Sequence, residues 1–329
     1  MLNYSFHFDK NNILKCSFQE NETQCWKGLF ALFIVLDHLW MQHNMIALTL
    51  FHESAVIIVS IYFFFSGYGV GINSMKRSDY MGLEFWKKRV LGLILPMVMV
   101  DSVMFIWKYF CGIEINGSTI LDYLTGKMLF NVQTWYIREL MICYLILHIM
   151  SKIFSKPKKI VIGCIICITL MNLVLFVCGY GYQWYGSSYG FIIGLYLAYS
   201  GGGYTRVQQK KVSLSHLSAI TLALTGLFSL IYKVVGRDVA WNVLITRNAM
   251  TFIATILFIC ILSVCTIKSR SFDKVSQISM EIYLIHMFVI EIYMKLEMSP
   301  FILVVAVLIT VVILSHLVHM CFRLIRNIV

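Results

Sequence analysis

Long apolar runs separated by short polar segments make up most of this chain. A helix needs about 20 apolar residues to cross a bilayer. Apolar runs near this length occupy residues 27–42, 55–72, 90–110, 135–150, 160–178, 187–199, 214–235, 244–267, 278–296 and 301–322, of which the sixth is short. The pattern predicts an all-α, polytopic membrane bundle of about ten transmembrane helices.

The composition excludes an ordinary soluble domain. Hydrophobic residues make up 59% of the chain and charged residues only 13%, whereas soluble domains carry about 25% charge. Lipid covers such apolar surface without penalty. We therefore expect a cytoplasmic N-terminal segment (1–26), a ten-helix membrane domain (27–322) and a short cytoplasmic tail (323–329).

The basic residues predict the orientation of the bundle. The chain has a net charge of +11, and cytoplasmic loops of membrane proteins are rich in Lys and Arg. With the N-terminus inside, 20 of the 27 basic residues fall on the cytoplasmic side, and residues 111–134 form an outside loop. Both termini are then cytoplasmic. Basic residues in such loops favour contact with membrane lipids over nucleic acid, for which the chain carries no aromatic and basic groove module.

The ten cysteines predict neither disulfides nor a metal site. Most of them lie in or beside apolar runs, where a cysteine behaves as a small hydrophobic residue. Cys164 and Cys167 have CxxC spacing, but no partner pair accompanies them. We expect no bound metal.

Ionisable residues inside apolar runs are costly and usually mark a site. His38 stands eleven residues after Lys27. On a helix this spacing is about three turns and about 16 Å of rise. Lys27 would then lie at the inner surface, on the same face as a deeper His38. An imidazole exchanges protons near neutral pH, so His38 is either a reacting base or a histidine satisfied by a backbone carbonyl.

Further ionisable residues leave two interpretations open. Arg138 and Glu139 begin the fourth run, where they are either wet interfacial residues or, for Glu139, a partner of a catalytic imidazole. His286 follows Tyr283 by about one turn, and packing or catalysis would explain it equally. The last run also contains two histidines that we expect to be packing or interfacial residues, namely His316 and His319.

Five strings in order resemble the membrane-bound acyltransferase 3 family. They are KGLFALFIVLDH (27–38), FFFSGYGVG (63–71), FWKKRVLGLILP (85–96), WYIRELMICY (135–144) and ISMEIYLIH (278–286). The family consists of ten-span enzymes that O-acetylate surface polysaccharides, peptidoglycan and related glycans. The ordered set covers nearly the whole chain, although each string alone is weak.

The resemblance implies roles for particular residues. The family's catalytic histidine matches His38, and Lys27 stands where the family carries an arginine, which retains charge but loses bidentate recognition. The family's glutamate follows its tryptophan by five residues, whereas Glu139 follows Trp135 by four. The implied set comprises catalytic His38, Glu139 and His286; donor-binding Lys27, Ser66, Lys87, Lys88, Arg89 and Arg138; and acceptor-binding or structural Trp135, Tyr144 and Tyr283.

The function implied is acyl transfer at the cell membrane. Cytoplasmic acetyl-CoA would be a co-substrate, with no bound cofactor, and its phosphates would meet the basic residues 87–89. A hydroxyl of an extracytoplasmic or lipid-linked saccharide would accept the acyl group, with His38 as general base or as acyl carrier. Two alternatives are a proton-coupled transporter or flippase that uses His38 and Glu281, and a non-catalytic membrane sensor domain.

Overall fold

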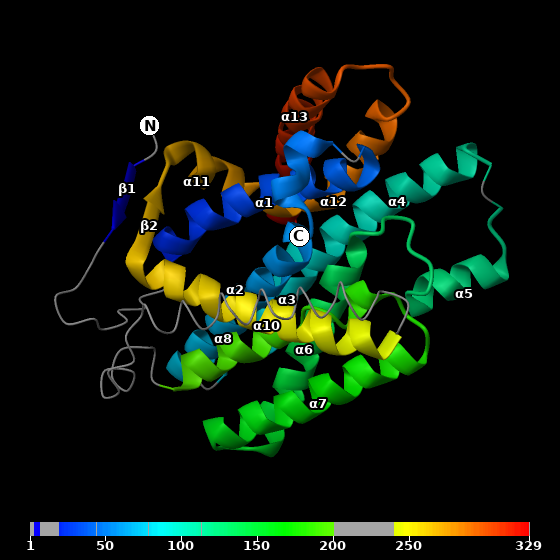
Figure 1. The fold of residues 1–329 in the computed structure, drawn as a ribbon. Coiled ribbons are helices and arrows are strands. Elements are labelled where there is room, and N and C mark those ends of the chain that lie inside the picture. Colours follow the sequence, from blue (N-terminus) through cyan, green and yellow to red (C-terminus); the bar gives the residue numbers. More distant parts are fainter. Residues whose placement is uncertain are drawn as a thin grey trace. The chain divides into compact units, whose positions relative to one another are not determined.

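The computed structural model describes residues 3–6, 20–43, 45–77, 79–112, 114–200 and 240–328, which form a mainly helical protein (Figure 1). The predicted helical class is confirmed, with one addition. A short strand β1 (Asn3–Phe6) pairs antiparallel with β2 (Cys265–Lys268). Helix α10 (Ala240–Val264) ends where β2 begins. The predicted span 244–267 is therefore too long, because the β-branched Thr266 and Ile267 favour a strand.

Twelve α-helices follow one another along the described chain. Besides α10, they are α1 (Glu20–His43), α2 (Ser54–Lys76), α3 (Leu83–Arg89), α4 (Leu95–Phe110), α5 (Gly117–Thr125), α6 (Thr134–Ile153), α7 (Pro157–Val177), α8 (Tyr189–Tyr199), α11 (Arg270–Gln277), α12 (Ser279–Tyr293) and α13 (Pro300–Ile328). Two 3₁₀ helices, Ile46–Phe51 and Tyr182–Trp184, precede α2 and α8, and a π-helical turn, Val90–Ile94, joins α3 to α4.

Five helical stretches are long and apolar enough to cross a membrane: Ile46–Lys76, Leu83–Phe110, Pro157–Val177, Trp241–Leu262 and Pro300–Ile325. A sixth results if α11 and α12, bent by 75° at their junction, count as one span. These six coincide with predicted runs. Helices also occupy the first, fourth and sixth predicted runs, but α1 and α6 carry several charges and α8 has only 11 residues. The predicted run 214–235 lies outside the described residues, and both the total of ten and the cytoplasmic termini stay predictions.

The chain divides into two compact units. The first comprises Met1–Thr23, Val56–Gly82 and Glu139–Lys268, as far as these are described, and the second comprises Gln24–Ala55, Leu83–Arg138 and Ser269–Val329. Boundaries fall inside α1, α2 and α6, so single helices contribute to both units. The single ten-helix membrane domain stays a prediction.

Glycines bring two helices of the first unit into backbone contact. A Cβ at Gly67 of α2 would overlap the carbonyl of Phe191 in α8, and a Cβ at Gly190 of α8 would overlap the carbonyl of Ser60. Small residues allow this close approach of helices in membranes. The hydroxyls of Ser60 and Thr255, on α10, lie 2.9 Å apart and join the third helix. Gly67 of the second sequence string therefore has a packing reason.

This contact predicts a position-specific loss of stability. We expect Gly67→Ala to lower the unfolding midpoint in detergent, because overpacking costs about 1–3 kcal/mol and a carbonyl cannot rotate away as a side chain can. The matched control is Gly69→Ala on the same helix, where an added Cβ meets nothing within 4 Å. Equal midpoints for the two variants would contradict the close packing of α2 on α8.

The second unit is built around α12. Helix α13 lies beside it (orange and red in Figure 1), with the hydroxyls of Tyr293 and Thr310 2.8 Å apart. Helix α4 packs on another side of α12, where the rings of Trp107 and Phe288 lie 5.6 Å apart. The buried carboxylate of Asp37 in α1 accepts a hydrogen bond from the backbone N–H that begins α2. These contacts fix α1 and α12, which carry the two predicted catalytic histidines.

Candidate functional site

His38 is held by the backbone of its own helix in a defined tautomer. Its Nδ1 lies 2.8 Å from the carbonyl oxygen of Ile34, one turn earlier in α1. A carbonyl oxygen only accepts hydrogen bonds, so Nδ1 carries the proton in the neutral ring. The lone pair is then on Nε2, which points away from the α1 backbone. The half-buried imidazole thus presents a basic nitrogen rather than an N–H group.

His286 meets His38 in the second unit and has the same arrangement. Its Nδ1 lies 3.0 Å from the carbonyl oxygen of Ile282, and its fully buried Nε2 has no hydrogen-bond partner among the described residues. The two imidazole rings contact edge to face with centroids 4.9 Å apart. Two histidines that are 248 positions apart in the sequence therefore form one cluster, which supports a shared site over independent packing roles.

Two tyrosines extend this cluster. The ring of Tyr283 lies 6.0 Å from His286 and 5.5 Å from Tyr136 at the start of α6. Trp135 is buried and its ring contacts that of Tyr136 at 6.3 Å. Tyr283 thus contacts His286 directly, and Trp135 is connected to it only through Tyr136. The predicted role of Tyr283 and Trp135 in acceptor binding or packing stays a prediction.

A polar segment just before α6 completes the surroundings of His38. The Nε2 atom of the buried Gln133 amide lies 3.4 Å from Nε2 of His38. Asn131 donates from its side-chain nitrogen to the carbonyl of Leu284 at 2.7 Å and accepts the backbone N–H of Gln133 at 3.1 Å. Sequence reasoning missed both residues. The signal available was the string NVQT, a polar group next to an apolar run within a predicted loop.

Arg138 contacts the short helix α5. Its Nη1 donates to the carbonyl of Tyr123 at 2.7 Å, and its guanidinium carbon lies 4.6 Å from the centre of the Tyr123 ring. The Tyr123 hydroxyl donates to the buried carboxylate of Asp101 at 2.6 Å. Burial, followed by the neighbouring Asp101, raises the pKa of Tyr123 to about 12, so the hydroxyl keeps its proton at neutral pH. These contacts explain why Arg138 is in α6, and its predicted role in donor binding stays a prediction.

Glu139 and Tyr144 belong to the first unit. Glu139 is completely buried, and Ser188 is the polar residue that faces it. Tyr144 is also buried and packs its ring 5.8 Å from that of Phe191. The catalytic role of Glu139 stays a prediction, and the surroundings of Tyr144 favour packing.

The predicted donor-binding residues lie on several helices. Lys27 is half-buried on α1, which is continuous through to His38, as its predicted spacing requires. Lys87 and Lys88 are exposed at the end of α3, whereas the Arg89 guanidinium carbon lies 5.1 Å from the centre of the Phe85 ring. Ser66 is half-buried on α2 in the first unit. The π-helical turn that follows Arg89 leads directly into α4.

A contact between two polar side chains joins α12 to α13. Nδ1 of His319 lies 2.8 Å from a carboxylate oxygen of Glu281, which is buried. The packing or interfacial role expected for His319 and His316 stays a prediction, and His316 is exposed. Within the part of the chain that the structure describes, no group of three or more His, Cys, Asp or Glu residues could hold a metal ion.

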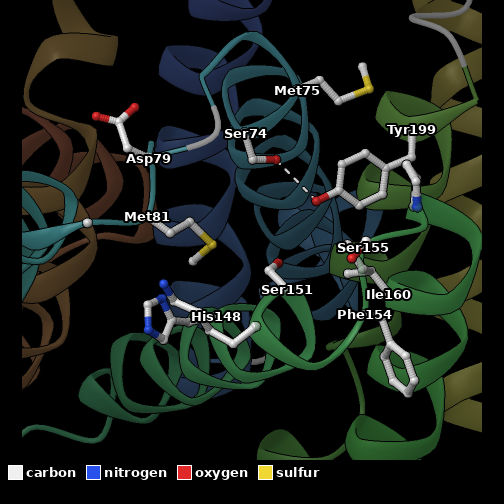
Figure 2. Close-up of a pocket in the computed structure, with 13 residues that line it drawn as sticks. Ser74, Met75, Asp79, Met81, His148, Ser151, Phe154, Ser155, Ile160 and Tyr199 are labelled. Carbon is white, nitrogen blue, oxygen red and sulfur yellow. Dashed lines mark hydrogen bonds between the residues drawn. The ribbon is translucent and has the colours of Figure 1, made fainter.

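The first unit contains a cavity of about 600 Å³ between the ends of α2, α6 and α8 (Figure 2). The hydroxyls of Ser74 and Tyr199 lie 3.1 Å apart across it, as the dashed line in Figure 2 shows. Its charged lining comprises one cation, Lys152, and one anion, Asp79, with His148 beside them. Opposite charges balance, so the lining alone favours neither an anion nor a cation.

Comparison with known proteins identifies one family. Residues 22–320 match a family model described as an acyltransferase domain, Acyl_transf_3. Neither the curated proteins nor the solved structures gave a match. The matched region contains every residue of the histidine cluster, together with Asn131 and Gln133.

Proposed function

This chain belongs to the acyltransferase 3 family and is a membrane acyltransferase, and we propose that it moves an acetyl or other acyl group from cytoplasmic acyl-CoA to a saccharide hydroxyl. The saccharide would be extracytoplasmic or lipid-linked, and the enzyme would lie in the cell membrane. The observation that carries the proposal is the basic Nε2 of His38, set beside the imidazole of His286.

The first route uses His38 as a general base. Its Nε2 takes the proton of the acceptor hydroxyl while the hydroxyl oxygen attacks the thioester carbonyl carbon. A C–O bond forms and the C–S bond breaks. The thiolate takes the proton back from Nε2 and leaves as the CoA thiol, so His38 returns to its neutral state.

The second route uses His38 as an acyl carrier. Nε2 attacks the thioester, a C–N bond forms and the C–S bond breaks, and the thiolate takes a proton from solvent. The acceptor hydroxyl then attacks the acyl-imidazole, a C–O bond replaces the C–N bond, and the hydroxyl proton passes to solvent. Both routes need the same lone pair on Nε2, which the Nδ1 contact with Ile34 keeps available.

Lys87 and Lys88 are the proposed partners of the CoA phosphates. Both side chains are exposed at the end of α3, and phosphate binding by cations uses strong charge-assisted hydrogen bonds. We expect Lys87→Gln with Lys88→Gln to raise the KM for acetyl-CoA at least about tenfold while kcat is retained. Arg89 is left in place because it packs on Phe85.

The control pair for this experiment is Lys156→Gln with Lys158→Gln, which removes two exposed cations at the start of α7. Initial rates measured over a range of acetyl-CoA concentrations give KM for both variants. An equal change in KM for the two pairs would mean that lysines 87 and 88 contribute only general positive charge.

Radiolabelled acetyl-CoA supplied to purified protein in vesicles tests the proposed function. Vesicles that also contain lipid-linked saccharide should yield labelled saccharide. Label on the protein in the absence of saccharide would favour the acyl-carrier route. Labelled molecules that cross the vesicle membrane without covalent transfer of the label would support a transporter. Label that neither crosses the membrane nor leaves acetyl-CoA would support a sensor domain. Either of these last two results would overturn the proposal.

A further inference from the structure

Gln133 occupies the lone pair that the proposed chemistry needs. With Nδ1 of His38 donating to Ile34, Nε2 of His38 accepts hydrogen bonds only. The amide nitrogen of Gln133, at 3.4 Å, is the donor placed there. Gln133 is only 4% exposed, so water does not readily replace its amide. In the resting protein, therefore, the reacting nitrogen is already engaged by a protein group.

The position of Gln133 is fixed by its neighbour Asn131. The Asn131 side chain accepts the Gln133 backbone N–H and donates to Leu284, two residues before His286 in α12. The hydroxyl of Thr134 donates to the Asn131 carbonyl at 2.8 Å and closes the turn into α6. Asn131, Gln133 and Thr134 are all buried. Three hydrogen bonds thus hold the segment of backbone from which the Gln133 side chain reaches His38.

An acceptor hydroxyl must donate to the same lone pair before it can lose its proton. An sp² nitrogen has one lone pair in the ring plane, so the hydroxyl and the Gln133 amide compete for one place. The amide holds the ring of His38 in the orientation that the hydroxyl requires. Its N–H donates to the neutral imidazole, whereas an imidazolium has no lone pair to accept it.

We propose that Gln133 is a positioning residue of the acyl transfer, which orients the neutral His38 imidazole and holds the place of the acceptor hydroxyl until the acceptor binds. The inference rests on the proposed function for its catalytic meaning. The contact between the amide and the imidazole can be tested apart from that function, through the chemical reactivity of His38.

Two substitutions of similar size act in opposite directions on Nε2 of His38. Gln133→Leu removes the donor and leaves the lone pair open. Gln133→Glu supplies a carboxyl group that either donates its proton to Nε2 or, once ionised, pairs with an imidazolium. In both cases the lone pair is taken. If the Gln133 side chain only filled space, the two substitutions would not change the reactivity of Nε2 of His38 in opposite directions.

The experiment measures how fast diethyl pyrocarbonate, which reacts with the unprotonated imidazole nitrogen, modifies His38 in the full-length protein. Mass spectrometry follows the peptide that contains His38. Loss of one neutral hydrogen bond should speed modification about 2–10-fold in Gln133→Leu. We expect modification at least about tenfold slower in Gln133→Glu, because the lone pair is then protonated or engaged. The control is Gln183→Glu, on the 3₁₀ helix Tyr182–Trp184 of the first unit.

Acetyl transfer by the same proteins supplies the second readout. Gln133→Leu should lower kcat about 10–100-fold, because small misplacements of reacting groups cost up to this much, and leave KM for acetyl-CoA unchanged. Gln133→Glu should lower kcat about 100-fold or more, as loss of a general base does. Gln183→Glu should match the wild-type protein in both readouts.

The two readouts separate failure of the inference from failure of the proposed function. The positioning role is overturned if diethyl pyrocarbonate modifies His38 at the wild-type rate in both Gln133→Leu and Gln133→Glu. It is also overturned if both substitutions change the modification rate in the same direction. If KM for acetyl-CoA rises while kcat is retained, Gln133 belongs to donor binding and the inference is also overturned. A different result would overturn the proposed function instead. In that case His38 is modified fastest in Gln133→Leu and slowest in Gln133→Glu, as predicted, but the wild-type protein transfers no acetyl group.

Discussion

His38→Ala should lower the rate of acetyl transfer by about 10²–10⁴, the usual cost of removing a general base. Both routes of the proposed reaction use Nε2 of His38, so the substitution should slow the reaction by either route. His38→Gln retains a polar side chain of similar length but no basic nitrogen, and it should lose as much activity. The measurement is the initial rate of label transfer from acetyl-CoA to saccharide in vesicles, normalised to inserted protein.

Three variants control this experiment. His316→Gln changes an exposed histidine of α13 and should retain full activity. Lys27→Arg should be tolerated, because the charge is retained at the position where the family carries arginine. Lys27→Ala should weaken activity less than loss of His38. Near-wild-type transfer by His38→Gln would show that the His38 imidazole neither accepts a proton nor carries the acyl group. The assignment of the site would then be wrong, although the chain would still belong to the family.

The second-largest effect is expected at His286. Its ring packs edge to face on His38, and its Nε2 is the one polar atom of that ring without a hydrogen bond among the described residues. We expect His286→Leu to lower kcat about 100-fold, because it removes a second lone pair from the site. The unfolding midpoint should change little, since an apolar residue that fills the space also removes a buried polar group.

The comparison variant is His316→Leu, which makes the same substitution on an exposed face of α13. Rates and unfolding midpoints of both proteins are measured in the same detergent. Retained kcat with a lowered midpoint in His286→Leu would assign His286 to packing, the alternative that the sequence left open.

Helix positions were predictable wherever composition alone determines them. Stretches such as α7 and α13 are long and strongly apolar and coincide with the predicted runs. The charged helices are harder to classify. Helix α1 holds Lys27 and Asp37, and its buried carboxylate is explained only by a backbone N–H at the start of α2. The partner that makes such a residue acceptable in an apolar core is distant in the sequence, so periodicity does not identify it.

The two histidines of the site could be predicted from the sequence, but the polar residues that contact them and their helix could not. His38 and His286 stood out as ionisable residues within apolar runs, and the structure brings them into contact. Asn131 and Gln133 lie in a short irregular segment, where polar residues are ordinary. Their significance comes from a hydrogen bond to a carbonyl 153 positions away and from one contact with an imidazole. Neither leaves a local pattern.

The bend between α11 and α12 was likewise hidden from the sequence. The predicted ninth run begins at residue 278, which is where the chain turns by 75°. The pattern locates the apolar helix, but it places residues 270–277 between two apolar runs, where the structure has the polar helix α11. Close contact at Gly28 of α1, where a Cβ would overlap the carbonyl of Phe272, shows what fixes α11 in place.

Release of free CoA thiol from acetyl-CoA tests the central claim most directly. Purified wild-type protein and His38→Gln, in identical vesicles with lipid-linked saccharide, are compared by the amount of thiol formed per protein per minute. The account predicts saccharide-dependent thiol release by the wild-type protein and a rate at least about 100-fold lower for His38→Gln. Equal rates of thiol release for the two proteins would contradict it.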